Sequence, residues 1–316
     1  MKGIFVNKNS QVRSGWKITA TLATFFAVTL VTAILFQLIF ILYLAAAKHM
    51  SLHDISVYGK TSLSIDSAFR TIGNILQCSS MIFSVVLFWK VFDKKPIRYI
   101  GFINLKHGYK DLLKGLLLGA ISLTAVFAIL LATGHITMLN PFSKPNFNMS
   151  LLNGLILFIF VGINEEMFAR GYCMTVLKQT GNKWVPAIVS AIIFALMHSM
   201  NSGISIFSYV NLFLFGLFTA YMFIRSGNLW LSIGYHITWN YFEGNVFGFL
   251  VSGQEANGIY NVKNKVDNII TGGSFGPEGG LVVTFIIAVG FIYLWKFYKP
   301  SMSNNSAKDN TIITEL

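Results

Sequence analysis

Acidic and basic side chains of the kind used in hydrolytic catalysis occur within stretches of sequence that are otherwise apolar. Glu165, Glu166 and Arg170 lie together at the end of one such stretch, and His198 and His236 lie in two others. Ionisable groups inside a segment that crosses a membrane are costly, and they usually face a cavity or a charged partner. These five residues are therefore the first candidates for a functional site.

Helical spacing separates the two glutamates. Residues four apart on a helix share one face, at about 40° of separation, so Glu166 and Arg170 are placed to form an ion pair. Glu165 lies about 100° around the helix from Glu166 and lacks that cation. We expect Glu166 and Arg170 to support the structure and Glu165 to face another partner. The alternative is that both carboxylates only mark a helix end in water.

Aromatic and amide side chains occur at the same spacing from the two histidines. Phe194 precedes His198 by four residues, so its ring can cover one flank of the imidazole. His236 precedes Asn240 by four, and Glu243 follows one turn later. A lone buried histidine is more often a core residue than a ligand. Two buried histidines and an unpaired glutamate on three helices favour a site.

Hydrolysis of a peptide bond inside a membrane needs an activated water, a proton carrier and a donor to the oxyanion. A carboxylate can act as the general base, and an imidazole or an Asn amide can donate to the oxyanion. Two histidines and a carboxylate could also form a three-ligand zinc site, here Glu165, His198 and His236. The residues alone leave both possibilities open.

The composition shows where these side chains must be placed. Hydrophobic residues make up 54% of the 316 residues and charged residues 11%, against about 25% charged in soluble domains. The mean hydropathy is +0.62. This excludes a soluble enzyme, a disordered chain and a nucleic-acid-binding module, and two isolated cysteines exclude a disulfide scaffold. We expect membrane lipid as a partner and no nucleic acid.

Apolar runs of about 20 residues, the length that spans a bilayer, predict an all-α polytopic bundle with about eight transmembrane helices. The bundle takes residues 18–298, between a basic N-terminal segment, 1–17, and a polar tail, 299–316. The predicted spans are Ile18–Ala45, Thr71–Val91, Leu112–Thr133, Leu151–Phe168, Trp184–Met200, Ile206–Ile224, Leu229–Val251 and Leu281–Phe297.

The basic residues predict the orientation of this bundle. Most of the 24 Lys and Arg residues fall in the N-terminal segment, in alternate connections and in the tail. Cytoplasmic connections carry such an excess. We therefore expect both termini in the cytoplasm and a multi-pass protein of the plasma membrane.

Three short motifs resemble those of a known family. Glu165-Glu166-x-x-x-Arg170, Phe194-x-x-x-His198 and His236-x-x-x-Asn240 follow one another on the fourth, fifth and seventh predicted spans, within residues 151–247. This set is similar to the motifs of the CPBP family. Its members are intramembrane peptidases related to CAAX prenyl endopeptidases and to bacteriocin-processing and self-immunity proteins.

The resemblance implies roles for the motif residues. Glu165 would activate water with His198 beside it, and His236 and Asn240 would stabilise the oxyanion. Phe194, Glu166 and Arg170 would give structural support. The substrate would be a membrane-associated protein or peptide, and a Zn²⁺ cofactor is left open.

Other functions have weaker support in the sequence. A proton-coupled transporter could use buried Glu and His, but no inverted repeat accompanies them. A non-proteolytic membrane scaffold or bacteriocin immunity factor could retain the same fold. No H-E-x-x-H motif occurs, and Gly272-x-Ser274-x-Gly276 falls in a Gly-rich loop rather than a strand-to-helix turn. Gly115-x-x-x-Gly119 predicts close packing of two helices, more simply within the chain than in a dimer.

Overall fold

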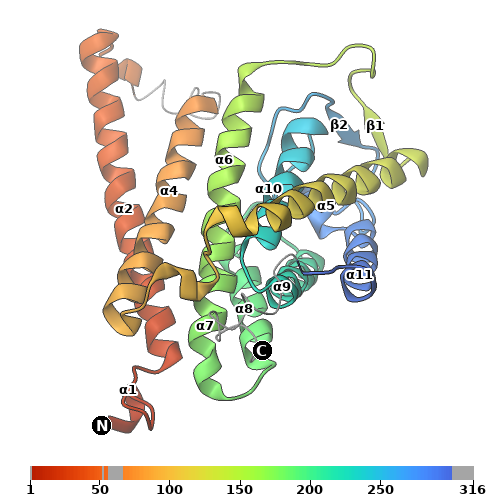
Figure 1. Ribbon diagram of the computed structural model, residues 1–316. Helices are drawn as coiled ribbons and strands as arrows, with labels where there is room; N and C mark the ends of the chain where they lie inside the picture. Colours follow the sequence, from red (N-terminus) through yellow and green to blue (C-terminus); the bar gives the residue numbers. More distant parts are fainter. Residues whose placement is uncertain (1, 52, 56–66, 301–316) are drawn as a thin grey trace.

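The predicted all-α polytopic bundle is confirmed by the computed structural model, which describes residues 2–51, 53–55 and 67–300 (Figure 1). The predicted tail lies outside the described residues from position 301 onward. Nearly all regular structure is helical. The α-helices are α1 Lys2–Phe5, α2 Ser14–Ala47, α4 Ser67–Phe88, α5 Leu105–Ala132, α6 Met149–Glu166, α7 Met174–Leu177, α8 Val185–Met197, α9 Ile206–Ser226, α10 Trp230–Tyr241 and α11 Leu281–Lys296.

The remaining elements are short. β1 (Ile136–Met138) and β2 (Val262–Asn264) form an antiparallel pair in which Thr137 lies opposite Lys263. Single turns of 3-10 helix occur between the longer helices. Their bounds are Ile97–Ile100, Lys178–Thr180, Gly273–Phe275 and Pro277–Gly279, and π-helical segments run over Trp89–Asp93, Met167–Cys173 and Phe242–Val246.

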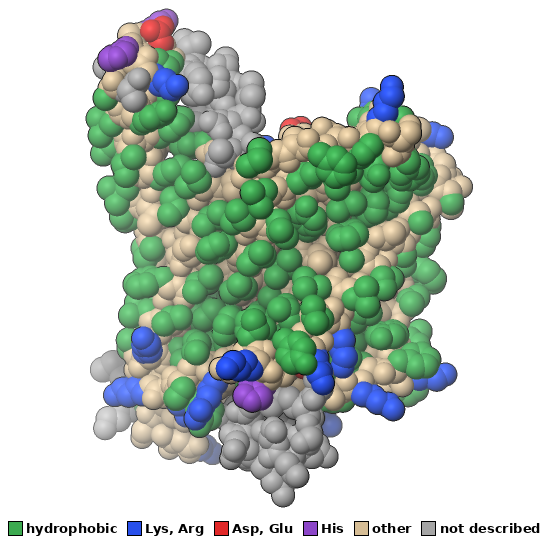
Figure 2. All heavy atoms as spheres, turned by 45° about the horizontal axis from the view of Figure 1, so that its top comes forward, with side chains coloured by type: hydrophobic (Ala, Val, Ile, Leu, Met, Phe, Trp, Pro, Cys, Tyr) green, Lys and Arg blue, Asp and Glu red, His purple; other side chains and the backbone are tan. Residues whose placement is uncertain are grey.

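Five helices in the described part of the chain are long and apolar enough to cross a membrane. They begin at Ser14, Phe69, Ile97, Met149 and Ile206 and correspond to five of the predicted spans. The helices α8, α10 and α11 occupy the other three predicted spans but are shorter, so the count of eight remains a prediction. Figure 2 shows an apolar band across one face, with Lys and Arg gathered along its lower edge.

The helices α2, α4 and α6 run side by side, and α5 runs at a steep angle to them on the other side of the molecule from α2, packed against α10 (Figure 1). The close packing expected at the two glycines of α5 is found within the chain. A Cβ added at Gly115 would lie 2.2 Å from the Leu231 carbonyl oxygen of α10, and one at Gly119 would lie 2.3 Å from that of Tyr235. The absence of side chains at these positions therefore lets the α5 and α10 backbones touch.

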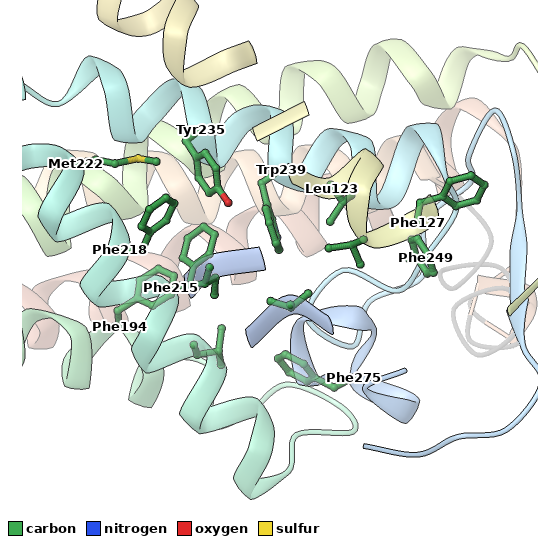
Figure 3. Packing of buried hydrophobic residues seen from close by; sticks show 14 of the residues in the cluster. Leu123, Phe127, Phe194, Phe215, Phe218, Met222, Tyr235, Trp239, Phe249 and Phe275 are labelled. Carbon is green, nitrogen blue, oxygen red and sulfur yellow. The ribbon is translucent and has the colours of Figure 1, made fainter. Parts of the chain in front are cut away.

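Aromatic side chains fill the space between α8, α9 and α10. Phe194 stacks on Phe215, and Phe215 packs against Tyr235 and Trp239 at centroid distances of 5.8 and 5.6 Å. Phe218 meets the edge of Tyr235. Figure 3 shows these rings converging from the three helices. They form a rigid wall beside α10, which carries two of the candidate site residues.

Candidate functional site

A cavity of about 670 Å³ lies inside the bundle, between α2, α4, α6, α8, α9 and α10. All four residues predicted to be catalytic line it. Glu165 lies at the end of α6, His198 caps the C-terminus of α8, and His236 and Asn240 lie on α10. Glu243, one turn beyond Asn240, is buried but does not line the cavity.

The convergence of these residues depends on a helix that is longer than predicted. The predicted fourth span ended at Phe168, but the helical path continues through a π-helical segment and α7 to Thr180. At about 1.5 Å per residue, Glu165 then lies about 22 Å from Thr180, and His198 lies about 21 Å from Trp184. Both residues are therefore deep in the bundle at a similar level.

The predicted ion pair between Glu166 and Arg170 is present and fully buried. Arg170 Nη1 lies 3.1 Å from Glu166 Oε1. Arg170 Nη2 also donates to the Gly216 carbonyl oxygen of α9 at 3.1 Å, and its guanidinium lies 4.3 Å from the centre of the Phe194 ring. A guanidinium presents several donors in a fixed plane. Arg170 therefore joins the α6 path to both α8 and α9.

Glu166 has a second partner, which the helical spacing did not reveal. Its Oε1 lies 3.0 Å from His236 Nδ1. Because an ionised carboxylate only accepts hydrogen bonds, Nδ1 carries the hydrogen and Nε2 is turned away from Glu166. Nε2 lies 3.7 Å from Glu165 Oε2. The two adjacent glutamates therefore meet opposite edges of one imidazole, with Glu166 orienting the ring and Glu165 on the cavity side.

Two aromatic rings restrict the same imidazole. Phe215 and Phe194 meet His236 edge-on, at centroid distances of 5.1 and 6.0 Å. The contact of Phe215 was missed, because nothing in its local sequence separates it from the other aromatic residues of α9.

His198 is held by its own helix. Its Nδ1 lies 2.9 Å from the Phe194 carbonyl oxygen, and the two rings are 5.0 Å apart, as the spacing of four predicted. The carbonyl oxygen can only accept, so Nδ1 donates and Nε2 of the neutral ring is left as an acceptor. His198 thus offers an acceptor to a cavity that Glu165 also lines.

The predicted zinc site of Glu165, His198 and His236 stays a prediction. Among the residues that the structure describes, no three His, Cys, Asp or Glu side chains are grouped so as to hold a metal ion. The contact of His236 Nδ1 with Glu166 leaves Nε2 on the side of Glu165.

The apolar bundle and its internal carboxylate–histidine site define an integral membrane protein with the side chains of a hydrolase. Residues 147–242 match the family model described as type II CAAX prenyl endopeptidase Rce1-like. This segment contains all three motifs, so the family resemblance inferred from them is confirmed where they occur.

One curated relative is named only as an uncharacterized 24.3 kDa protein of Escherichia coli. It is 29% identical over 128 residues, which cover 38% of this chain. The match spans 58% of the relative's own length. No solved structure matches the chain.

Proposed function

We propose that the protein is an intramembrane endopeptidase that hydrolyses a peptide bond of a membrane-associated protein or peptide with water activated by Glu165. The observation that carries this proposal is the placement of Glu165 between the cavity and a histidine whose far edge is fixed by Glu166. The match to the endopeptidase family supports the same class of reaction.

In the proposed first step, a water molecule binds between Glu165 and His198. It donates one hydrogen bond to His198 Nε2 and gives its other proton to the Glu165 carboxylate as its oxygen attacks the carbonyl carbon of the peptide. Asn240 Nδ2 and a protonated His236 Nε2 are the donors for the resulting oxyanion. Such donors act best when they are fixed before the reaction, and Glu166, Phe194 and Phe215 fix the His236 ring.

In the second step, the tetrahedral intermediate collapses and the C–N bond breaks. Glu165 returns its proton to the leaving amine, which regenerates the carboxylate. One residue thus acts first as base and then as acid. A glutamine at this position has nearly the same shape but cannot accept the proton.

The proposal is tested with purified protein in lipid and an internally quenched peptide as reporter. We expect Glu165→Gln, His198→Ala and His236→Ala each to abolish cleavage while the variants stay folded. Asn240→Ala removes one oxyanion donor and should lower kcat by about 10²–10³. The double variant Glu165→Gln with Asn240→Ala should cleave little more slowly than Glu165→Gln alone, because the effects of residues that act in one step are not additive. Wild-type turnover by Glu165→Gln would refute the assignment of the base.

A further inference from the structure

Besides Asn164, four carboxamide side chains on α2, α4 and α6 line the cavity. Gln37 lies on α2, Asn74 and Gln77 on α4, and Asn153 on α6. All four lie on helices long and apolar enough to span a membrane. Within the described parts of the chain, none of these amide groups forms a hydrogen bond, although each has two donors and an acceptor.

Such groups are costly against lipid tails. An amide placed in hydrocarbon without a hydrogen-bond partner loses the hydration that it has in water. Polar side chains in spanning helices accordingly face the interior of a bundle or a watery cavity. The shared cavity is where these four amides find partners, and those partners must themselves be polar.

The amides lie on three neighbouring helices that line one cavity. Asn74 and Gln77 are three residues apart on one face of α4, and Asn153 lies on α6. The helices α4 and α6 meet beside Glu165, where Asn164 Nδ2 contacts Cys78 Sγ at 3.5 Å. The amides therefore follow a path that leads to the catalytic residues. This path is the amide-lined cleft.

We propose that the amide-lined cleft binds an extended, unlipidated stretch of peptide next to the scissile bond. Carboxamides offer a donor and an acceptor side by side, which matches the N–H and C=O groups of a main chain. Recognition of this kind depends on the backbone and tolerates varied side chains. The proposal rests on the proposed function of the site and specifies its substrate.

The length of the cleft sets the length of the bound stretch. Glu165 and Asn153 are separated by about 18 Å along α6 at about 1.5 Å per residue. An extended chain rises about 3.3 Å per residue, so about five residues on one side of the scissile bond fill the cleft.

Cysteine labelling tests the cleft without relying on catalysis. In the Glu165→Gln protein in lipid nanodiscs, Asn153→Cys is treated with a charged, water-soluble thiol reagent. A mixed-sequence peptide of about ten residues, long enough to fill the cleft, or a prenyl alcohol is then added. We expect rapid labelling that becomes about tenfold slower at a peptide concentration about ten times its Kd, with no protection by the alcohol.

Two controls set the background. The parent protein has Cys78, which is buried but lines the cavity, and the buried Cys173, so labelling of the parent protein with and without peptide is subtracted. Asn9→Cys is exposed near the N-terminus and outside the cavity, and it should react without protection by peptide. In the same assay, Gln77→Leu should weaken peptide binding, whereas Asn9→Leu should not.

The outcomes separate this proposal from that of the catalytic function. Slow labelling of Asn153→Cys, protection by the alcohol alone, or no protection by peptide would overturn the peptide cleft. If the peptide protects but wild-type protein does not cleave it, the endopeptidase proposal fails while the cleft stands. If wild-type protein cleaves the peptide but the peptide does not protect Asn153→Cys, the cleft proposal fails while the endopeptidase proposal stands.

Discussion

Removing Arg170 tests how the buried site is supported. The guanidinium is fully buried against Glu166, the Gly216 carbonyl and the Phe194 ring. Arg170→Met leaves the Glu166 carboxylate buried with His236 as its remaining close partner. Breaking a buried ion pair typically costs about 3–5 kcal/mol. We therefore expect the ratio of folded to unfolded protein to fall by about two to three and a half orders of magnitude.

Matched variants separate charge from packing. Arg170→Lys keeps the charge near Glu166 but loses the planar group that also reaches Gly216, and should cost about 1–3 kcal/mol. Combining Glu166→Leu with Arg170→Met replaces the buried pair by apolar side chains, which often restores stability. This double variant should recover stability but not cleavage, because His236 has lost the carboxylate that orients it.

The assay is thermal unfolding of the purified proteins in detergent, with peptide cleavage measured in parallel. A charge swap, Glu166→Arg with Arg170→Glu, should not restore activity, because it brings a guanidinium to the His236 ring. Wild-type stability of Arg170→Met would refute the structural role. Recovery of cleavage by the apolar double variant would refute the orienting role of Glu166.

Three further predictions concern packing, metal and orientation. Gly119→Leu should lower the melting temperature, since its Cβ would lie 2.3 Å from the Tyr235 carbonyl oxygen, whereas Gly15→Leu, which points into open space, should not. Equal changes in melting temperature for Gly119→Leu and Gly15→Leu would contradict the packing of α5 on α10. Peptide cleavage should persist after treatment with a chelator, and loss of activity that zinc restores would instead favour a metal site. In proteoliposomes, Asn257→Cys and Asn9→Cys should be labelled from opposite sides, and labelling from one side would overturn the predicted orientation.

The helical bundle and the site residues could be predicted because their signals are local. Apolar runs identify helices, and spacing by four identified the contacts of Glu166 with Arg170 and of Phe194 with His198. The end of the fourth span was wrong for a physical reason. Arg170 resembles a residue in water at a helix end, but its charge is neutralised inside the bundle by Glu166, so the helix continues to Thr180.

Contacts between helices could not be derived in the same way. Spacing tells which residues share a face of α10, but not which helix that face meets. The contact between Glu166 and His236 therefore required the three-dimensional arrangement. The same holds for Gly216, which contributes only a backbone carbonyl to Arg170. No side-chain pattern could indicate such a role.

Two of the three helices that carry catalytic candidates, α6 and α10, change from α- to π-helical geometry directly beyond those residues, at Met167 and at Phe242. A π-helical turn spaces its hydrogen bonds one residue further apart, so it accommodates an additional residue without interrupting the helix. In an α-helix each residue corresponds to about 100° of rotation. Deleting one residue from Met167–Cys173 would therefore turn Glu165 and Glu166 relative to α7. During evolution, the length of this segment should be constrained more strictly than the identity of its apolar residues.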